Sequence, residues 1–143
     1  MQQEKELNFK VTSFLLGLQF LSIIRLKKSK EIDLEKLGKS TAYFPLIGLL
    51  LGAILIGANF IYTKFLPQPV ANILLLITLI TIRGGFHLDG FADTVDGFFS
   101  GRNKEKILEI MKDSRIGSHG VVGLVCLVLF KFTLLNNISE LYK

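Results

Sequence analysis

Cysteine is nearly absent from this chain of 143 residues. Cys126 is the single one, and it lies inside an apolar run. One cysteine excludes an internal disulfide framework and a zinc site built from several thiolates. His87 and His119 have no second histidine or cysteine at zinc-ligand spacing, so a zinc site is not expected. A small-residue cleavage site is missing after the first apolar stretch, and we expect no removable signal peptide.

Acidic residues are absent from three long apolar stretches, and half of the chain is apolar. The stretches are 43–66, 70–82 (extending from Pro67 to Phe86 when its polar ends are included) and 118–135. Because a helix needs about 20 apolar residues to cross the hydrocarbon core, these predict about three membrane spans. The apolar stretch 11–24 is shorter and contains four polar residues, which favours an interfacial or re-entrant helix. We therefore predict an all-α, polytopic integral membrane protein that forms a single helical membrane domain over residues 1–143.

Basic residues are concentrated in two places. Residues 25–39 contain six lysines and arginines, and residues 102–115 contain five. Two predicted crossings separate these stretches, so both should lie on the same side of the membrane, which the excess of positive charge predicts to be the cytoplasm. Beside apolar spans, such charge favours contact with anionic membrane lipid over nucleic acid, for which the sequence has no recognised binding motif. We expect a multi-pass protein of the cell inner membrane whose active site faces the cytoplasm.

Three aspartates follow the second apolar stretch, in the sequence RGGFHLDGFADTVDG at residues 83–97. Asp89, Asp93 and Asp96 are spaced i, i+4 and i+7, so a helix would place them on one face. Like charges so close repel one another unless a cation lies between them. Carboxylate oxygens are hard ligands, which favours Mg²⁺ and, with it, a phosphate ester as substrate. The alternative is that the aspartates are solvated residues at the end of a helix.

Glycines and a histidine surround these aspartates. Gly84, Gly85, Gly90 and Gly97 would let the backbone approach a bulky ligand, or would simply interrupt a helix where it leaves the bilayer. The sequence does not separate these two interpretations. His87 is a candidate base or phosphate donor, although an ordinary interfacial histidine is the simpler interpretation.

Residues 103–115 predict an amphipathic surface helix capped by Asn103. At its end, Asp113 is a candidate acidic ligand or general base, and Lys112 and Arg115 are candidates to neutralise phosphate charge. A solvated charged helix end is the alternative.

Two motifs, GGFHLDGFADTVDG and EIMKDSRIGSHGVVGL, resemble the signature of the cobamide synthase family (adenosylcobinamide-GDP ribazoletransferase, cobalamin 5′-phosphate synthase). LLGLQFLSIIR and YFPLIGLLLGA resemble the same family, so the resemblance covers the whole chain, although family members are longer and continue with further spans. It implies an Mg²⁺-dependent transferase of the last steps of coenzyme B12 synthesis. The 3′-hydroxyl of α-ribazole, or of its 5′-phosphate, would attack the cobinamide-side phosphorus of adenosylcobinamide-GDP, and GMP would leave.

By position, Asp89, Asp93 and Asp96 match the acidic motif of this family, and Asp113 and Arg115 match its second motif. The individual roles that follow are our own inference. Those expected to bind the metal are Asp89, Asp93 and Asp96. Those expected to act in catalysis are Asp96, Asp113 and His87, and those expected to bind the substrates are Lys112, Arg115, Gly90 and Gly97.

Two alternatives to this function stay open at this point. Another Mg²⁺-dependent membrane transferase, acting on CDP-alcohols or prenyl diphosphates, would also use spaced aspartates, but the two motifs fit such enzymes poorly. A fragment of a divalent-cation transporter would need acidic groups near the middle of the bilayer, whereas these follow a span. A homo-oligomer is compatible with the sequence.

Overall fold

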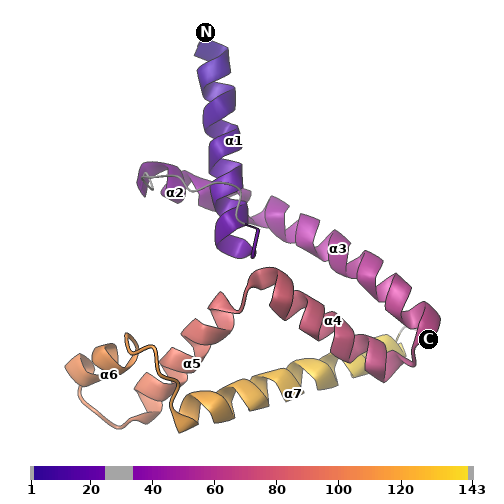
Figure 1. Ribbon diagram of the computed structural model, residues 1–143, viewed down its shortest axis with the longest axis vertical. Coiled ribbons are helices and arrows are strands. Elements are labelled where there is room, and N and C mark those ends of the chain that lie inside the picture. The colour runs from indigo at the N-terminus through magenta and orange to yellow at the C-terminus, as the bar shows by residue number, and fades with distance from the viewer. Residues whose placement is uncertain (1, 25–33, 142–143) are drawn as a thin grey trace. The chain divides into compact units, whose positions relative to one another are not determined.

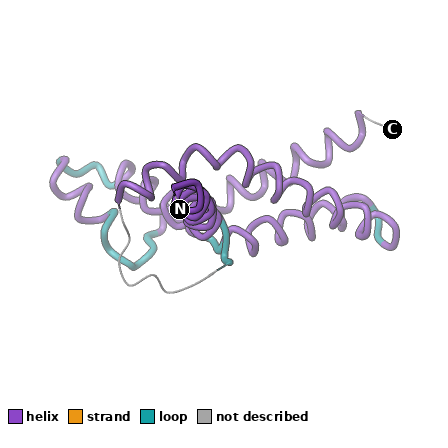
Figure 2. The backbone as a smooth tube through the Cα atoms, turned by 90° about the horizontal axis from the view of Figure 1, so that it is seen from above, coloured by secondary structure: helices purple, strands orange, loops and turns teal. Residues whose placement is uncertain are grey.

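In the described part of the chain, residues 2–24 and 34–141, every regular element of this computed structural model is a helix (Figure 1). Figure 2 shows these helices joined by short loops, with no strand among the described residues. This confirms the all-α prediction. Residues 25–33 of the basic stretch 25–39 lie outside the described residues. The elements are α1 (Gln2–Leu21), α2 (Leu34–Ser40), η1 (Thr41–Tyr43), α3 (Phe44–Phe65), α4 (Gln68–Arg83), α5 (Phe86–Phe99), α6 (Lys104–Ile110) and α7 (Ser118–Leu141).

Two helical stretches are long and apolar enough to cross a membrane. They are Leu37–Phe65, which includes α3, and Ser118–Ile138 in α7, and the pair α4 plus α5 makes a third if it counts as one bent span. The polytopic membrane fold is therefore confirmed, and the spans begin and end close to the predicted residues.

The predicted second span ends earlier than expected. Helix α4 stops at Arg83, and Gly84 and Gly85 follow with φ angles of 66° and 73°, in the left-handed region that favours glycine. Helix α4 has 16 residues and is therefore about 24 Å long, which is less than the roughly 30 Å thickness of a hydrocarbon core. Helices α4 and α5 meet at 91°, as in a broken span or a re-entrant loop. The expectation that one helix runs through Phe86 is thus wrong, because the glycine pair ends it.

The chain divides into two compact units. One comprises Met1–Phe65 and Thr78–Gly84, and its core is formed by Leu18, Ile47 and Leu51. Gly17 makes this core possible, because a Cβ there would lie 2.9 Å from the Ile47 side chain. The prediction of a single domain over residues 1–143 stays a prediction.

The other unit comprises Leu66–Ile77 and Gly85–Lys143 and contains all the candidate site residues. Within it, α5 packs along α7 and also against α6. Towards the end of α7, the side chain of Asn72 on α4 donates to Asn136 at 2.8 Å and accepts from Gln68 at 3.0 Å. The contact between Asn72 and Asn136 joins α4 to α7 within the unit.

Candidate active site

Helix α5 carries all three aspartates, as predicted. The helix begins after Gly85, whose left-handed backbone lets the chain turn into it. The three carboxylates differ in exposure: Asp89 is exposed, Asp93 is half-buried, and Asp96 is only 8% exposed. The face they share is therefore covered progressively towards the end of α5, where α7 packs against it.

The Asp96 carboxylate binds the backbone at the start of α7. Its Oδ2 accepts from the Gly117 amide at 2.7 Å, and its Oδ1 accepts from the Gly120 amide at 2.8 Å. The first amides of a helix have no partner within the helix, and the positive end of the helix dipole favours a negative charge there. Asp96 thus supplies from α5 the cap that α7 does not supply for itself.

The described residues contain no group of three or more acidic, histidine or cysteine side chains arranged to hold a metal ion. Asp89 and Asp93 remain as two hard oxygen donors one helical turn apart. A pair of carboxylates suits Mg²⁺, which keeps several waters and binds substrate phosphates through its remaining positions. Asp89 and Asp93 therefore fit Mg²⁺ as a two-carboxylate site, and the expectation that all three aspartates bind the ion stays a prediction.

The second motif lies in a turn and loop after α6. Asn103 caps α6 as predicted, with its side chain accepting from the Lys106 amide at 3.1 Å. The helix ends at Ile110, earlier than expected, and the chain continues as a loop, residues 111–117, to the start of α7. The candidate residues Asp113 and Arg115 are therefore held by a loop rather than by a helix end.

Asp113 and Arg115 form a forked ion pair. The Arg115 Nη2 lies 2.7 Å from Asp113 Oδ2, and Nε donates at 3.1 Å to Oδ1. The Arg115 amide also donates to Oδ1 at 3.0 Å, which closes the turn. These bonds to Arg115 lower the pKa of Asp113, and the same pair raises the pKa of Arg115. The contact orients an arginine whose side chain is 88% exposed, so its remaining donors can reach an anion.

A polar cleft of about 200 Å³ joins the end of α5 to this loop and to the start of α7. It brings together Asp96, Asp113 and Arg115, three of the predicted site residues. The exposed Lys112 lies in the turn just before Asp113 and does not line the cleft, and neither do Asp89 and Asp93. The other residues that line it are Ser100, Ile110, Gly117, Ser118 and His119.

The two histidines differ in their surroundings. His87, in the first turn of α5, is exposed, has its ring edge-on to Phe86 and does not line the polar cleft. His119, in the first turn of α7, lines the cleft and stacks on Phe99 with ring centroids 6.0 Å apart. The sequence could not distinguish them, because each is a lone histidine beside an apolar stretch.

Glycines explain how closely these elements pack. A Cβ at Gly117 or Gly120 would collide with the Asp96 carboxylate, and one at Gly123 would lie 3.1 Å from Val95. We did not predict this set from the sequence, although the recurrence of glycine every three residues, which places successive glycines on neighbouring turns of a helix, was the available signal. Gly97 was expected at the ligand but packs against Met111, whereas a Cβ at Gly90 would meet nothing within 4 Å.

Comparisons with known proteins agree with these motifs. The model of the cobalamin-5-phosphate synthase family matches residues 13–142. The chain belongs to this family. Proteins named adenosylcobinamide-GDP ribazoletransferase from Geotalea daltonii and Acetivibrio thermocellus are 44% and 43% identical over 83% and 87% of the chain. The relative from Fusobacterium nucleatum is 44% identical over 88% of it. No solved structure matches the chain.

The chain spans about half the length of the curated relatives it matches, between 48% and 50% of the three proteins above. The matched half includes both cobalamin-5-phosphate synthase motifs noted in the sequence, on α5 and in the 111–117 loop.

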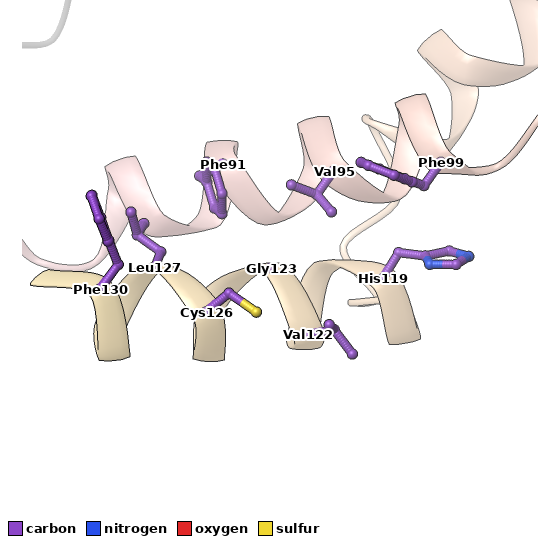
Figure 3. Close-up of a pocket in the computed structure, with 9 residues that line it drawn as sticks. All are labelled: Phe91, Val95, Phe99, His119, Val122, Gly123, Cys126, Leu127 and Phe130. Carbon is purple, nitrogen blue, oxygen red and sulfur yellow. The ribbon is translucent and has the colours of Figure 1, made fainter. Parts of the chain in front are cut away.

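An apolar cleft of about 420 Å³ adjoins the polar one in this family member. Figure 3 shows it between two facing rows of side chains, with Phe91, Val95 and Phe99 on α5 and His119, Cys126 and Phe130 on α7. Because His119 lines both clefts, it lies at the boundary between the polar and apolar surfaces of the unit.

Proposed function

We propose that this chain carries the metal-binding and phosphate-binding residues of an adenosylcobinamide-GDP ribazoletransferase. The activity would join adenosylcobinamide-GDP to α-ribazole or its 5′-phosphate, with release of GMP. The observation that carries the proposal is the match of residues 13–142 to the family, with both acidic motifs in one structural unit. The names of the relatives from Geotalea daltonii and Acetivibrio thermocellus support a transfer that involves adenosylcobinamide-GDP and a ribazole group, and the release of GMP is part of our proposal.

Asp89 and Asp93 are the proposed Mg²⁺ ligands. Both are carboxylates on accessible turns of α5, whereas the two Asp96 oxygens already accept backbone amides. Asp89 and Asp93 would hold the ion, whose positive charge would offset the charge that builds up on the departing GMP. The protein's own contribution is to hold these two carboxylates at fixed positions one turn apart.

Arg115 is the proposed phosphate-binding residue of the polar cleft. Its guanidinium is oriented by two bonds to Asp113, and its exposure leaves donors for a phosphate oxygen. Because the pKa of Asp113 is lowered, this carboxylate is a weaker base than an ordinary aspartate. The geometry therefore favours an orienting role for Asp113 over the role of general base that the sequence suggested.

We place this site on the cytoplasmic side of the inner membrane. The support is the positive charge of residues 102–115, which border the polar cleft, since loops rich in lysine and arginine remain on the cytoplasmic side. The apolar surface of α3 and α7 would face membrane lipid.

A genetic exchange tests the function. The matching half of the Fusobacterium nucleatum relative is replaced by this chain, and the chimaera is expressed in cells that lack their own ribazoletransferase. We expect the cells to form the complete corrinoid, measured by mass spectrometry, and to lose at least about 100-fold of it with Asp93→Asn, because a metal ligand is removed. A chimaera that reaches the membrane in normal amount but forms no product would contradict the proposal, and metal flux without product would favour a transporter.

A further inference from the structure

We propose that Asp96 is a positioning residue, which fixes the 111–117 loop with its Arg115 by binding the start of α7, and is not a ligand of the metal. This inference rests on the proposed function insofar as it gives Asp96 a part in the reaction. Its structural basis is independent of that function.

Both oxygens of Asp96 are engaged by protein. They accept the Gly117 amide at 2.7 Å and the Gly120 amide at 2.8 Å, and the residue is only 8% exposed. The two donors are backbone amides at the positive end of a helix, where a metal cation would meet the same positive potential. The Gly117 and Gly120 amides occupy one acceptor site on each oxygen, and the burial of Asp96 leaves little of its carboxylate accessible to a hydrated metal ion.

The backbone opposite Asp96 has room only for glycine. A Cβ at Gly117 or Gly120 would overlap the carboxylate, and a Cβ at Gly120 would also lie 3.0 Å from the Ala92 carbonyl oxygen. The residues at three positions are therefore suited to the same contact. They are Asp96 on α5 and Gly117 and Gly120 around the start of α7. Such matching indicates that the contact itself is required.

The neighbouring residue holds the other end of the same loop. Gly97 packs against Met111, where a Cβ would lie 2.8 Å from the Met111 Cγ. Met111 and Gly117 are the two ends of the 111–117 loop, so two adjacent residues of α5 contact both of its ends. Asp113 and Arg115 lie between these two fixed points and line the same cleft as Asp96. The direction of the Arg115 guanidinium is thus set from α5.

The test compares Asp96→Asn with Asp93→Asn in the full-length membrane protein, using two measurements that need no catalysis. Asparagine keeps the size of aspartate but has one acceptor oxygen in place of two, so one amide loses its partner. Hydrogen exchange of residues 111–123 should accelerate at least about tenfold in Asp96→Asn, because its amides lose protection. Binding of Mn²⁺ alone, followed by electron paramagnetic resonance, should weaken less than about threefold in Asp96→Asn but at least about tenfold in Asp93→Asn.

Matched glycine variants sharpen the comparison. Gly120→Ala should reproduce the faster exchange of residues 111–123, whereas Gly57→Ala on α3, where a Cβ meets nothing within 4 Å, should leave it unchanged. In the active enzyme, Asp96→Asn should raise the KM for the diphosphate donor about tenfold, at an unchanged half-saturating Mg²⁺ concentration, because Arg115 is less well oriented.

Two results would overturn the inference. One is loss of Mn²⁺ binding in Asp96→Asn as severe as in Asp93→Asn, and the other is unchanged exchange of residues 111–123. If the unmodified protein binds no Mn²⁺, the metal part of the proposed function fails, and the exchange measurement alone decides the role of Asp96.

Discussion

Helix α7 is held by polar contacts at two places that differ in kind. At its start, a carboxylate on α5 binds two backbone amides of the helix. Towards its end, the buried side chain of Asn72 on α4 binds the side chain of Asn136. The first contact borders a cleft with Arg115 and fixes a loop, whereas the second joins two apolar helices through neutral amides. The comparison shows that a polar contact between membrane helices can either position the residues of a site or simply hold two helices together.

The largest effect is expected from overfilling the first contact. Gly120→Val would push its side chain into the Asp96 carboxylate and the Ala92 carbonyl. Because displacement of catalytic groups by about 1 Å can cost around 100-fold in rate, we expect a loss of that order in the transfer rate. The rate is measured in membranes that contain equal amounts of each variant. Gly57→Val is the matched control, and an equal loss in both variants would show that added bulk, not the Asp96 contact, is responsible.

A smaller loss of transfer activity is expected when the guanidinium of Arg115 is replaced by a group of the same charge. Arg115→Lys cannot bind the Asp113 carboxylate with two parallel donors, so its ammonium is oriented less well. We expect the kcat/KM for the diphosphate donor to fall about tenfold, since a charge-assisted bidentate contact becomes a single one. Unchanged kinetics at saturating Mg²⁺ would remove Arg115 from the phosphate site.

The second contact should affect stability and leave the chemistry intact. Asn72→Leu removes the hydrogen bond that Asn72 donates to Asn136, and we expect the free energy of unfolding in detergent to fall by about 1 kcal/mol. Adding Asn136→Leu should recover part of this loss, because two apolar side chains then replace both members of the hydrogen-bonded pair. A double-mutant cycle of thermal unfolding, with transfer activity measured in parallel, checks both statements. If Asn72→Leu lost transfer activity without losing stability, the proposed difference between the two contacts would be wrong.

The smallest effect concerns pH. Arg115 lowers the pKa of Asp113 below the ordinary value of 3.8, so the folded state binds this proton less readily than the unfolded state. The stabilisation from the pair is therefore complete above that ordinary value and is lost as the pH falls through the lower, folded value. Asp113→Asn should remove this acid dependence, which unfolding measured across the acidic range can detect. Identical acid sensitivity in both proteins would mean that the pair does not form in solution.

The spans and the placement of the aspartates could be predicted because each depends on residues close in sequence. The apolar stretch at 43–66 became α3, and the i, i+4, i+7 spacing of Asp89, Asp93 and Asp96 became one face of α5. Asn103 was found because a cap depends on residues within one turn.

The rest of the site depends on tertiary pairing. Asp96 accepts from Gly117 and Gly120, which lie 21 and 24 residues further along the chain. No local pattern shows which of the three aspartates will contact α7. The same reason applies to His119, whose role follows from the packing of α7 beside Phe99. The helical spacing of the three aspartates therefore predicted a metal site of three carboxylates, whereas the packing of α7 on α5 buries Asp96.

Release of GMP from adenosylcobinamide-GDP by purified protein is the most direct test of the central claim. With the chimaera described above in detergent, we predict release that requires both α-ribazole and Mg²⁺ and is abolished by Asp93→Asn. Release of GMP at the same rate without Mg²⁺, or from the Asp93→Asn protein, would contradict the account.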